Sequence, residues 1–343
     1  MSALSILYLG TGGGTSRDRA NAYRRMGHEV LHLDPRSMLP ASVWIDRLLW
    51  RVGGGLLSHW TCKALAARLA GTHYDLCHVD SGEYITPAAL GLLRRHCAKV
   101  ISYNIDDPYG PRDGRRFAAY RAAVPHYDLV VVVRALNVPE ARALGARHVI
   151  RVNMSADELK HAPLVLSEAD RAEWASEVLF IGTWMPERGP FLAELLRLGV
   201  PLTIRGARWQ RAPEWPQLAA AYRGPAVFGA DYAKAIQGAR INIGLLSKEN
   251  RDLHTTRSLE IPALGSLLCA ERTPDHKDMY SEGREAVFWA DAAECARQCL
   301  ELLADESRRA AMAAAGQRRV HANRDFNEPM LEKVLGALRA ASA

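Results

Sequence analysis

The stretch "RDLHTTRSLEIPALG" combines residue types that suit the binding of an anionic ligand. Thr255 and Thr256 stand where the cap of a helix is expected, and a glycine follows where the helix should end. The start of a helix attracts anions, so this segment could hold a diphosphate, with Arg257 adding positive charge. Glu260, about one turn inside the helix, could accept hydrogen bonds from two ribose hydroxyls. A surface ion pair between Arg257 and Glu260 explains the same residues equally well.

Further candidates follow other expected strands. In "ISYNIDDP", Asp106 and Asp107 end a strand, where ligands commonly bind, although an Asp-Pro turn without chemistry is an equal alternative. Arg188, in "FIGTWMPERGP", could bind phosphate through its forked guanidinium or could be a surface residue. Arg205, in "IRGARW", again lies just after a strand.

A glycine run, "LGTGGGTSRD", follows the first expected strand and opens a helix. It matches a dinucleotide-binding turn only in part, because a threonine stands where the third glycine belongs, although Asp34 lies where a ribose-binding acid is expected. A tight turn at the edge of a cleft and a substrate-facing loop are the other interpretations. Among these, we expect a substrate-facing loop formed by Gly12, Gly13 and Gly14.

The elements that position these residues repeat in two series. Short apolar runs alternate with helical patterns from residue 4 to about 150, and again from residue 176 onward, with a polar acidic stretch between them. Strands that alternate with helices predict parallel sheets covered by helices, and 343 residues suit two domains. We therefore predict an α/β protein of two Rossmann-like domains, with ligands at the carboxyl ends of the strands.

Composition narrows the class of protein. The net charge of +6 comes without a nucleic-acid-binding motif, so we expect no nucleic acid partner; an anionic substrate or a peripheral contact with an acidic membrane explains it as well. No apolar run is long enough for a membrane helix, and the first residues lack a basic leader, so a cytoplasmic location is expected. The sequence does not indicate an oligomeric state.

The six cysteines are scattered without a C-x-x-C motif, which is typical of reduced thiols. Cys295 and Cys299 share a helical face. With no nearby histidine and no third cysteine expected, they are predicted to pack in the core rather than to bind metal.

The order of motifs in residues 176–320 resembles that of GT-B glycosyltransferases, in particular the CgeB-like (spore maturation protein) group related to family 4. The resemblance is carried by "LFIGTW…ER", "LTIRGARW", "AVFGADYAKAIQGARINIGLL" and "DLHTTRSLEIPALGSLL", while "YNIDDP" in the first half is similar to an Asp-rich turn of that group. It implies two Rossmann-like domains facing across a cleft. The implied parts are an acceptor-binding domain at 1–158, a nucleotide-sugar donor-binding domain at 159–322, and a final helix at 323–343 that packs back on the first domain.

The resemblance also implies roles for individual residues. In the related family 4, two acidic residues eight positions apart mark the donor site, and Asp252 and Glu260 have this spacing, with aspartate in place of the usual first glutamate. Glu260 would then bind the ribose, and Asp252 would lie near the transferred sugar. Arg188 matches a phosphate-binding residue, while Arg257 or Lys248 would replace a lysine that the sequence lacks. The nucleobase pocket is expected at Arg205, Val227, Phe228 and Gly229.

The resemblance therefore implies a hexosyltransferase that moves a sugar from a nucleotide-diphosphate donor to a glycan, protein or small-molecule acceptor, with Gly12, Gly13 and Gly14 on the acceptor side. The expected reaction is retaining and needs no metal or other cofactor, with Asp106, Asp107 and Asp252 as catalytic candidates. The alternatives are a GT-B-shaped nucleotide-sugar epimerase, an NAD-type two-domain oxidoreductase and a non-catalytic nucleotide-sugar binding protein.

Overall fold

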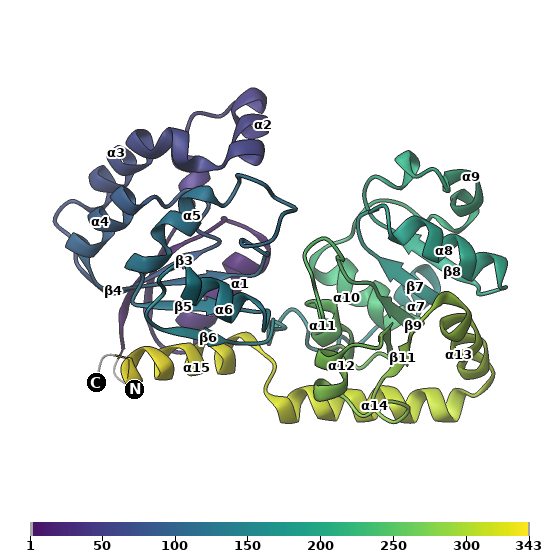
Figure 1. The fold of residues 1–343 in the computed structure, drawn as a ribbon. Helices are drawn as coiled ribbons and strands as arrows, with labels where there is room; N and C mark the ends of the chain where they lie inside the picture. Colours follow the sequence, from purple (N-terminus) through teal and green to yellow (C-terminus); the bar gives the residue numbers. More distant parts are fainter. Residues whose placement is uncertain (1–2, 342–343) are drawn as a thin grey trace. The chain divides into compact units, whose positions relative to one another are not determined.

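The computed structural model describes residues 3–341, and the chain divides into two compact units (Figure 1). Unit 1 comprises Met1–Asn153, Glu249–Arg251 and Asn327–Ala343, and unit 2 comprises Met154–Lys248 and Asp252–Phe326. The chain thus passes between the units a few residues away from the boundaries expected at 158 and 322. Three residues of a loop in the second half, Glu249–Arg251, belong to unit 1.

Unit 1 is built on a six-stranded parallel sheet in the order β2-β1-β3-β4-β5-β6. Its strands are β1 (Ser5–Leu9), β2 (Glu29–Leu33), β3 (Tyr74–Asp80), β4 (Cys97–Asn104), β5 (Leu129–Val132) and β6 (Val149–Arg151). The β5 strand is buried along its whole length, as is expected of a parallel strand covered on both faces.

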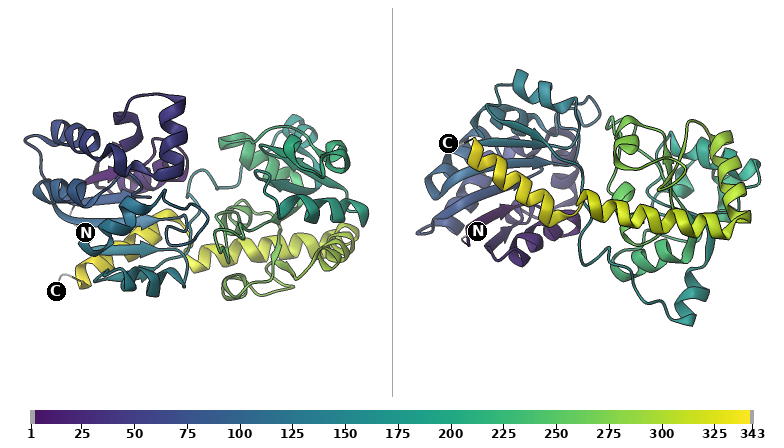
Figure 2. Two further views of the ribbon diagram at one scale, coloured as in Figure 1. Left: turned by 45° about the horizontal axis from the view of Figure 1, so that its top comes forward. Right: turned by 90° about the horizontal axis from the view of Figure 1, so that it is seen from below.

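The helices of unit 1 are α1 (Gly14–Arg25), α2 (Val43–Val52), α3 (Ser58–Leu69), α4 (Pro87–His96), α5 (Ala118–Ala123), α6 (Asn137–Ala143) and α15 (Asn327–Ala340). The C-terminal helix α15 packs beside α1 (Figure 2). Between the two helices, Arg25 Nε donates to Glu328 Oε1 at 2.6 Å. The last helix of the chain therefore completes the first unit, as the predicted fold class requires.

Unit 2 has a five-stranded parallel sheet in the order β11-β10-β9-β7-β8. Its strands are β7 (Ser176–Ile181), β8 (Leu202–Arg205), β9 (Ala239–Gly244), β10 (Leu268–Glu271) and β11 (Val287–Trp289). Its helices are α7 (Glu168–Trp174), α8 (Arg188–Arg197), α9 (Trp215–Leu218), α10 (Gly229–Gly238), α11 (Arg257–Ala263), α12 (Pro274–Met279), α13 (Ala292–Ala304) and α14 (Glu306–Asn323). Short 3₁₀ turns occupy Pro35–Met38, Gly54–Leu57, Val124–His126, Trp209–Arg211 and Ala219–Ala221.

Both sheets reverse their strand order beside their first strand, between β1 and β3 in unit 1 and between β7 and β9 in unit 2. In open α/β sheets this reversal opens a crevice at the carboxyl ends of the strands, where ligands bind. The predicted α/β architecture of two Rossmann-like units is confirmed, and it directs attention to these two sheet edges.

Within the described residues, no helix is both long enough and apolar enough to span a bilayer.

Candidate functional site

Arg188 forms hydrogen bonds with two loops at the switch point of unit 2, the loop after β7 and the loop after β9. It is the first residue of α8 and is largely buried. Its guanidinium donates to the carbonyl of Thr183, at 2.9 Å, in the loop after β7, and to that of Leu246, at 3.3 Å, in the loop after β9. Arg188 therefore fixes the positions of these two loops relative to each other, at the place where the sequence predicts a diphosphate.

Gly206 makes a close backbone approach at the same edge. Its φ is +146°, and a Cβ added there would lie 1.9 Å from the carbonyl oxygen of Gly182. That oxygen also accepts a hydrogen bond from Trp209 Nε1 at 2.9 Å. Only glycine fits at position 206, because any side chain would force the loop after β7 away from the loop after β8.

Glu260 lies on α11 with 6% of its surface exposed. Its Oε2 accepts a 2.6 Å hydrogen bond from the hydroxyl of Tyr232 on α10. Burial, reinforced by the charge of Glu260, raises the pKa of Tyr232 well above its ordinary value, so the phenol remains a donor. Glu260 is therefore held by a neighbouring helix rather than by Arg257.

His161 approaches the second oxygen of Glu260. Its Nδ1 accepts the backbone N–H of Asp157 at 2.8 Å, so in the neutral ring the proton is on Nε2, which lies 3.8 Å from Glu260 Oε1. The ring also meets Tyr232 edge-on, with centroids 6.1 Å apart. Sequence reasoning missed both residues, because Tyr232 was seen only as one residue of a longer motif, His161 belongs to none, and both are distant in the chain from Glu260.

Arg257 does not form the surface ion pair with Glu260 that was the alternative interpretation. Its Nε instead donates to the carbonyl of Ile181, the last residue of β7, at 2.9 Å. Arg257 thus lies at the carboxyl end of β7, where the diphosphate is expected.

The start of α11 is held by side chains other than the predicted threonine caps. Thr256 occupies the N-cap position with helical angles, but its side chain makes no capping hydrogen bond. The N–H of Thr255 donates instead to Ser258 Oγ at 3.1 Å, and Ser258 Oγ lies 2.8 Å from His276 Nε2. His276 Nδ1 in turn lies 2.6 Å from the carbonyl of Glu271.

This geometry assigns the protons of the chain of hydrogen bonds. His276 Nδ1 faces a carbonyl and must donate, so its Nε2 accepts from the hydroxyl of Ser258. Burial lowers the pKa of His276 to about 4, which keeps the ring neutral and able to accept. The N–H of Thr255 is therefore bonded to Ser258, and this chain of hydrogen bonds holds the first turn of α11 against His276 and β10.

A second histidine fixes the loop just before α11. His254 Nε2 accepts the N–H of Met154 at 3.0 Å, and its Nδ1 lies 2.7 Å from Asp275 Oδ2. Thr273 Oγ1 donates to the carbonyl of Leu253 at 2.6 Å. The residues around the start of α12 thus hold the loop that contains the candidate site residue Asp252.

Asp252 is buried in this loop, and its N–H donates to the carbonyl of Ser247 at 3.2 Å. Lys248, the alternative phosphate-binding cation, forms an ion pair with Glu271 at the end of β10. The loop is therefore closed on itself between Ser247 and Asp252, eight residues before Glu260.

The predicted nucleobase residues are only partly brought together. Val227, Phe228 and Gly229 lead into α10, the helix that supplies Tyr232, and the Phe228 ring is 79% exposed. Arg205, at the end of β8, stacks its guanidinium carbon 4.8 Å from the Trp174 ring centroid. The structure thus links residues 227–229 to Glu260 through one helix, whereas Arg205 packs against a different one.

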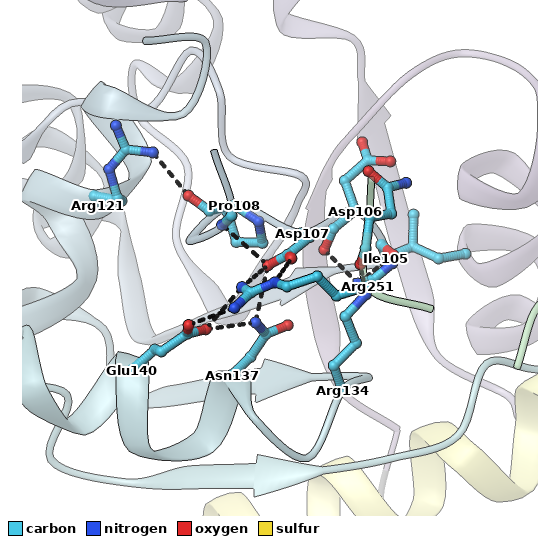
Figure 3. Close-up of polar contacts among 11 residues, drawn as sticks. Ile105, Asp106, Asp107, Pro108, Arg121, Arg134, Asn137, Glu140 and Arg251 are labelled. Atoms are coloured by element: carbon cyan, nitrogen blue, oxygen red, sulfur yellow. Dashed lines mark hydrogen bonds and ion pairs between the residues drawn. The ribbon is translucent and has the colours of Figure 1, made fainter. Parts of the chain in front are cut away.

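In unit 1, Asp107 lies at the centre of a polar cluster (Figure 3). Its Oδ1 accepts from Arg251 Nη2 at 2.8 Å and from Asn137 Nδ2 at 2.9 Å, and its Oδ2 accepts from Arg251 Nε. Arg251 also donates to Glu140 at 2.8 Å. Burial alone would raise the pKa of Asp107, but the hydrogen bonds from Arg251 and Asn137 hold it below its ordinary value.

Arg134 joins the same cluster through backbone oxygens. It donates to the carbonyl of Asn250 at 2.6 Å, of Ile105 at 3.0 Å and of Asp106 at 2.8 Å (Figure 3). Together, Arg134 and Asp107 hold residues 250 and 251, which directly precede Asp252. This explains why these loop residues belong to unit 1.

Asp106 has a different environment from its neighbour. Its side chain is about one third exposed, and burial raises the pKa of the carboxyl although Arg116 lies 3.7 Å away. It lines a cavity of about 150 Å³ at the carboxyl ends of β1, β3 and β4, at the switch point of unit 1. Asp106 can therefore exchange a proton with a ligand there more readily than Asp107 can.

The glycines predicted to form a substrate-facing loop do not line this cavity. Gly10 and Thr11 line it, whereas Gly12, Gly13 and Gly14 are exposed beside it. At its floor, buried Arg19 and Asp80 form an ion pair of 2.6 Å, which sequence reasoning missed because the two residues are 61 positions apart.

The expectation that no third cysteine lies near Cys295 and Cys299 is wrong. Cys269 Sγ, on β10, lies 3.9 Å from Cys295 Sγ and 4.0 Å from Cys299 Sγ. All three thiols are buried in the apolar core of unit 2. A structural zinc needs four ligands, and the cluster found in the described part of the chain offers three.

Comparison with known proteins agrees with this architecture. Residues 188–331 match a family model described as "Glycosyl transferase-like". No curated protein gives a significant sequence match.

Several solved structures share the fold. Sucrose-phosphate synthase from Thermosynechococcus elongatus is similar with a TM-score of 0.71 and 13% identity, covering 98% of this chain and all of that one. Anabaena HepE in complex with UDP-glucose gives a TM-score of 0.68 and 14% identity over the same shares. The α,α-trehalose 6-phosphate synthase from Burkholderia multivorans gives 0.64 and 10%, covering 99% of each chain. The chain therefore has the GT-B fold, and its second half contains a glycosyltransferase-like segment.

Proposed function

We propose that this chain is a cytoplasmic glycosyltransferase of the CgeB-like group, which moves a hexosyl residue from a nucleotide-diphosphate donor to an acceptor. The observation that carries the proposal is the position of Glu260. It is a buried carboxylate on α11, held by Tyr232, eight residues after Asp252, within the segment that matches the glycosyltransferase-like family model.

In this proposal unit 2 binds the donor. Glu260 accepts from the ribose hydroxyls, and Phe228 with its neighbours lies against the base. The diphosphate lies at the carboxyl end of β7, where Arg257 is anchored and where Arg188 fixes both flanking loops. Negative charge develops on the diphosphate as the glycosidic bond breaks, so these cations and the start of α11 stabilise the leaving group without a metal.

Unit 1 is proposed to bind the acceptor in the cavity lined by Asp106. A retaining reaction needs no strong base from the protein, and Asp252 then lies beside the transferred sugar. If the reaction inverts, a carboxylate must take the acceptor proton. Asp106 suits that role better than Asp107, whose two oxygens are already engaged by Arg251.

Among the structural relatives, Anabaena HepE was solved with UDP-glucose. The first experiment is therefore a thermal unfolding series with UDP, GDP, ADP, dTDP and their sugars. A ligand at a hundredfold its dissociation constant adds about 2.7 kcal/mol to the free energy of unfolding. Stabilisation by one diphosphate and its sugar is the expected result, and no response to any of them would overturn the proposal.

Turnover distinguishes the alternatives. A transferase consumes the donor only with an acceptor, an epimerase consumes it without one, and a binding protein does neither. An NAD-type oxidoreductase would bind NAD(H) in unit 1, but Asp34 already accepts from the N–H of Gly12 at 3.0 Å and of Arg36 at 2.9 Å. Loss of activity in EDTA that magnesium restores would reject the metal-free mechanism.

A further inference from the structure

Six large apolar side chains are exposed between residues 43 and 60, on α2, on the glycine link after it and at the start of α3. Trp44 is 75% exposed, Trp50 63% and Trp60 56%. Large apolar side chains are seldom left in water in such density. We call this surface the tryptophan face, and it consists of Val43, Trp44, Leu48, Trp50, Leu56 and Trp60.

Helix α2 contributes little to the core of unit 1. Leu49 is its one buried residue, so nearly all of the helix faces solvent. Trp44, Arg47, Leu48 and Arg51 follow the spacing that brings side chains onto one side of a helix. That side therefore presents a tryptophan and a leucine together with two arginines, and the guanidinium of Arg47 lies 5.2 Å from the Trp44 ring centroid.

The surface is basic as well as apolar. Residues 42–69 contain four lysines and arginines and a single acid, Asp46. Asp46 is neutralised by Arg36, whose Nη2 lies 2.6 Å from its Oδ1. The charge that remains on residues 42–69, which include the tryptophan face, is positive.

We propose that the tryptophan face docks on the surface of an anionic lipid bilayer. Tryptophan prefers the headgroup layer, where its ring is apolar and its N–H is hydrated, and arginine pairs with anionic headgroups. A helix with apolar and basic side chains on its exposed side lies in the plane of such an interface. A second copy of the chain suits the face less well, because self-pairing would bring like charges together.

Docking at this face involves one wall of the unit 1 cavity. The link residue Gly54 donates to the carbonyl of Glu83 at 3.1 Å, and a Cβ on Gly54 would lie 2.4 Å from the Tyr84 ring. Arg116 stacks 4.4 Å from the Trp50 ring centroid. Glu83, Tyr84 and Arg116 all line the cavity, so the cavity wall is in direct contact with Trp50 and with the glycine link.

The test is co-sedimentation of the full chain with vesicles of phosphatidylcholine alone or with added phosphatidylglycerol. Binding is expected to the anionic vesicles and should weaken as salt is raised, because screening removes the headgroup attraction. The variant Trp44→Ala/Trp60→Ala should lose about tenfold or more of its vesicle affinity per tryptophan. Both side chains are largely exposed, so the thermal unfolding midpoint of this variant should equal that of the unaltered chain.

The matched control is Leu159→Ala/Leu300→Ala, which removes two exposed apolar side chains of unit 2. It should bind vesicles as the unaltered chain does. Failure of the unaltered chain to bind anionic vesicles would overturn the proposal, as would an equal loss in the control. Sedimentation velocity without lipid adds a further outcome. A dimer that Trp44→Ala/Trp60→Ala dissociates would assign the face to a second copy instead.

Discussion

The ribose role of Glu260 gives the sharpest test of the donor site. The change is Glu260→Gln, which keeps the length of the side chain and an oxygen that can accept from Tyr232. Because the site is buried, truncation to alanine would leave the Tyr232 hydroxyl unsatisfied and would confuse binding with stability. Glutamine removes the charge and replaces the second acceptor oxygen, Oε1, with a neutral NH2 donor.

The magnitude follows from the two oxygens of Glu260. Oε2 already accepts from Tyr232 at 2.6 Å, while Oε1 lies 3.8 Å from His161 Nε2, which is too long for a hydrogen bond, so Oε1 is the atom left for the ribose. Hydrogen bonds to charged acceptors are worth about 1.5–3 kcal/mol and neutral ones about 0.5–1.5. The exchange should therefore cost about 1–2 kcal/mol, a roughly 5- to 30-fold weaker affinity.

The assay is titration calorimetry with the diphosphate that stabilises the chain most, compared with its 2′-deoxy analogue. The loss should be large for the ribonucleotide and small for the analogue, since the analogue lacks one of the hydroxyls that Glu260 binds. Tyr232→Phe should give a smaller loss of about 2- to 10-fold, because Glu260 then loses the bond that orients it. The matched control is Glu285→Gln, a buried glutamate of unit 2 paired with Arg319.

Two results would refute this reasoning. Equal losses for the ribonucleotide and its 2′-deoxy analogue would show that Glu260 acts on the nucleotide through something other than the ribose. Unchanged affinity in Glu260→Gln would remove Glu260 from the site altogether.

Three further predictions concern stability. Gly206→Ala should lower the free energy of unfolding by about 3 kcal/mol or more in urea, because its Cβ meets the Gly182 carbonyl at 1.9 Å; a loss below 1 kcal/mol would contradict this. Arg251→Ala should lower the free energy of unfolding by about 1–3 kcal/mol, because it removes the ion pair of the buried Asp107 carboxylate. The double variant Arg251→Ala/Asp107→Asn should regain part of this free energy, and no regain would argue against the pair. His276 has a folded pKa of about 4 against about 6.5 unfolded, so the unfolded chain binds the extra proton and stability falls as pH falls between these values. Urea titrations should show that His276→Gln removes up to about 3 kcal/mol of this pH dependence, and an unchanged slope would refute the assignment.

The architecture could be predicted because parallel strands buried on both faces appear in the sequence as continuous apolar runs. "YDLVVVV" became β5, and "SEVLFIGTW" became β7. The strand order was not written in those runs, since it depends on which strands pair. The carboxyl ends of the strands were nevertheless known, and this was enough to place Arg188 and Arg257 near the same sheet edge.

The contacts of the candidate site could not be predicted in the same way. Tyr232 and His161 reach Glu260 from segments 28 and 99 positions earlier, and neither residue stands out in its own helix or turn. The sequence likewise did not reveal that Cys269 contacts Cys295 and Cys299. A strand and a helix that pack together leave no local pattern in the sequence. Spacing along one element reveals a shared face, whereas contacts between elements emerge only from the fold.

Asp106 and Asp107 show how far two adjacent residues of one type can diverge. The strand that precedes them ends at Asn104, and the two carboxylates then enter different surroundings. Asp107 is enclosed with Arg251 and Asn137, which lower its pKa, while burial beside the cavity raises the pKa of Asp106. Pairs of carboxyl groups whose pKa values are driven apart divide the tasks of a site, one staying charged and one able to carry a proton. Here the charged member positions the loop before Asp252, and the other is left facing the cavity.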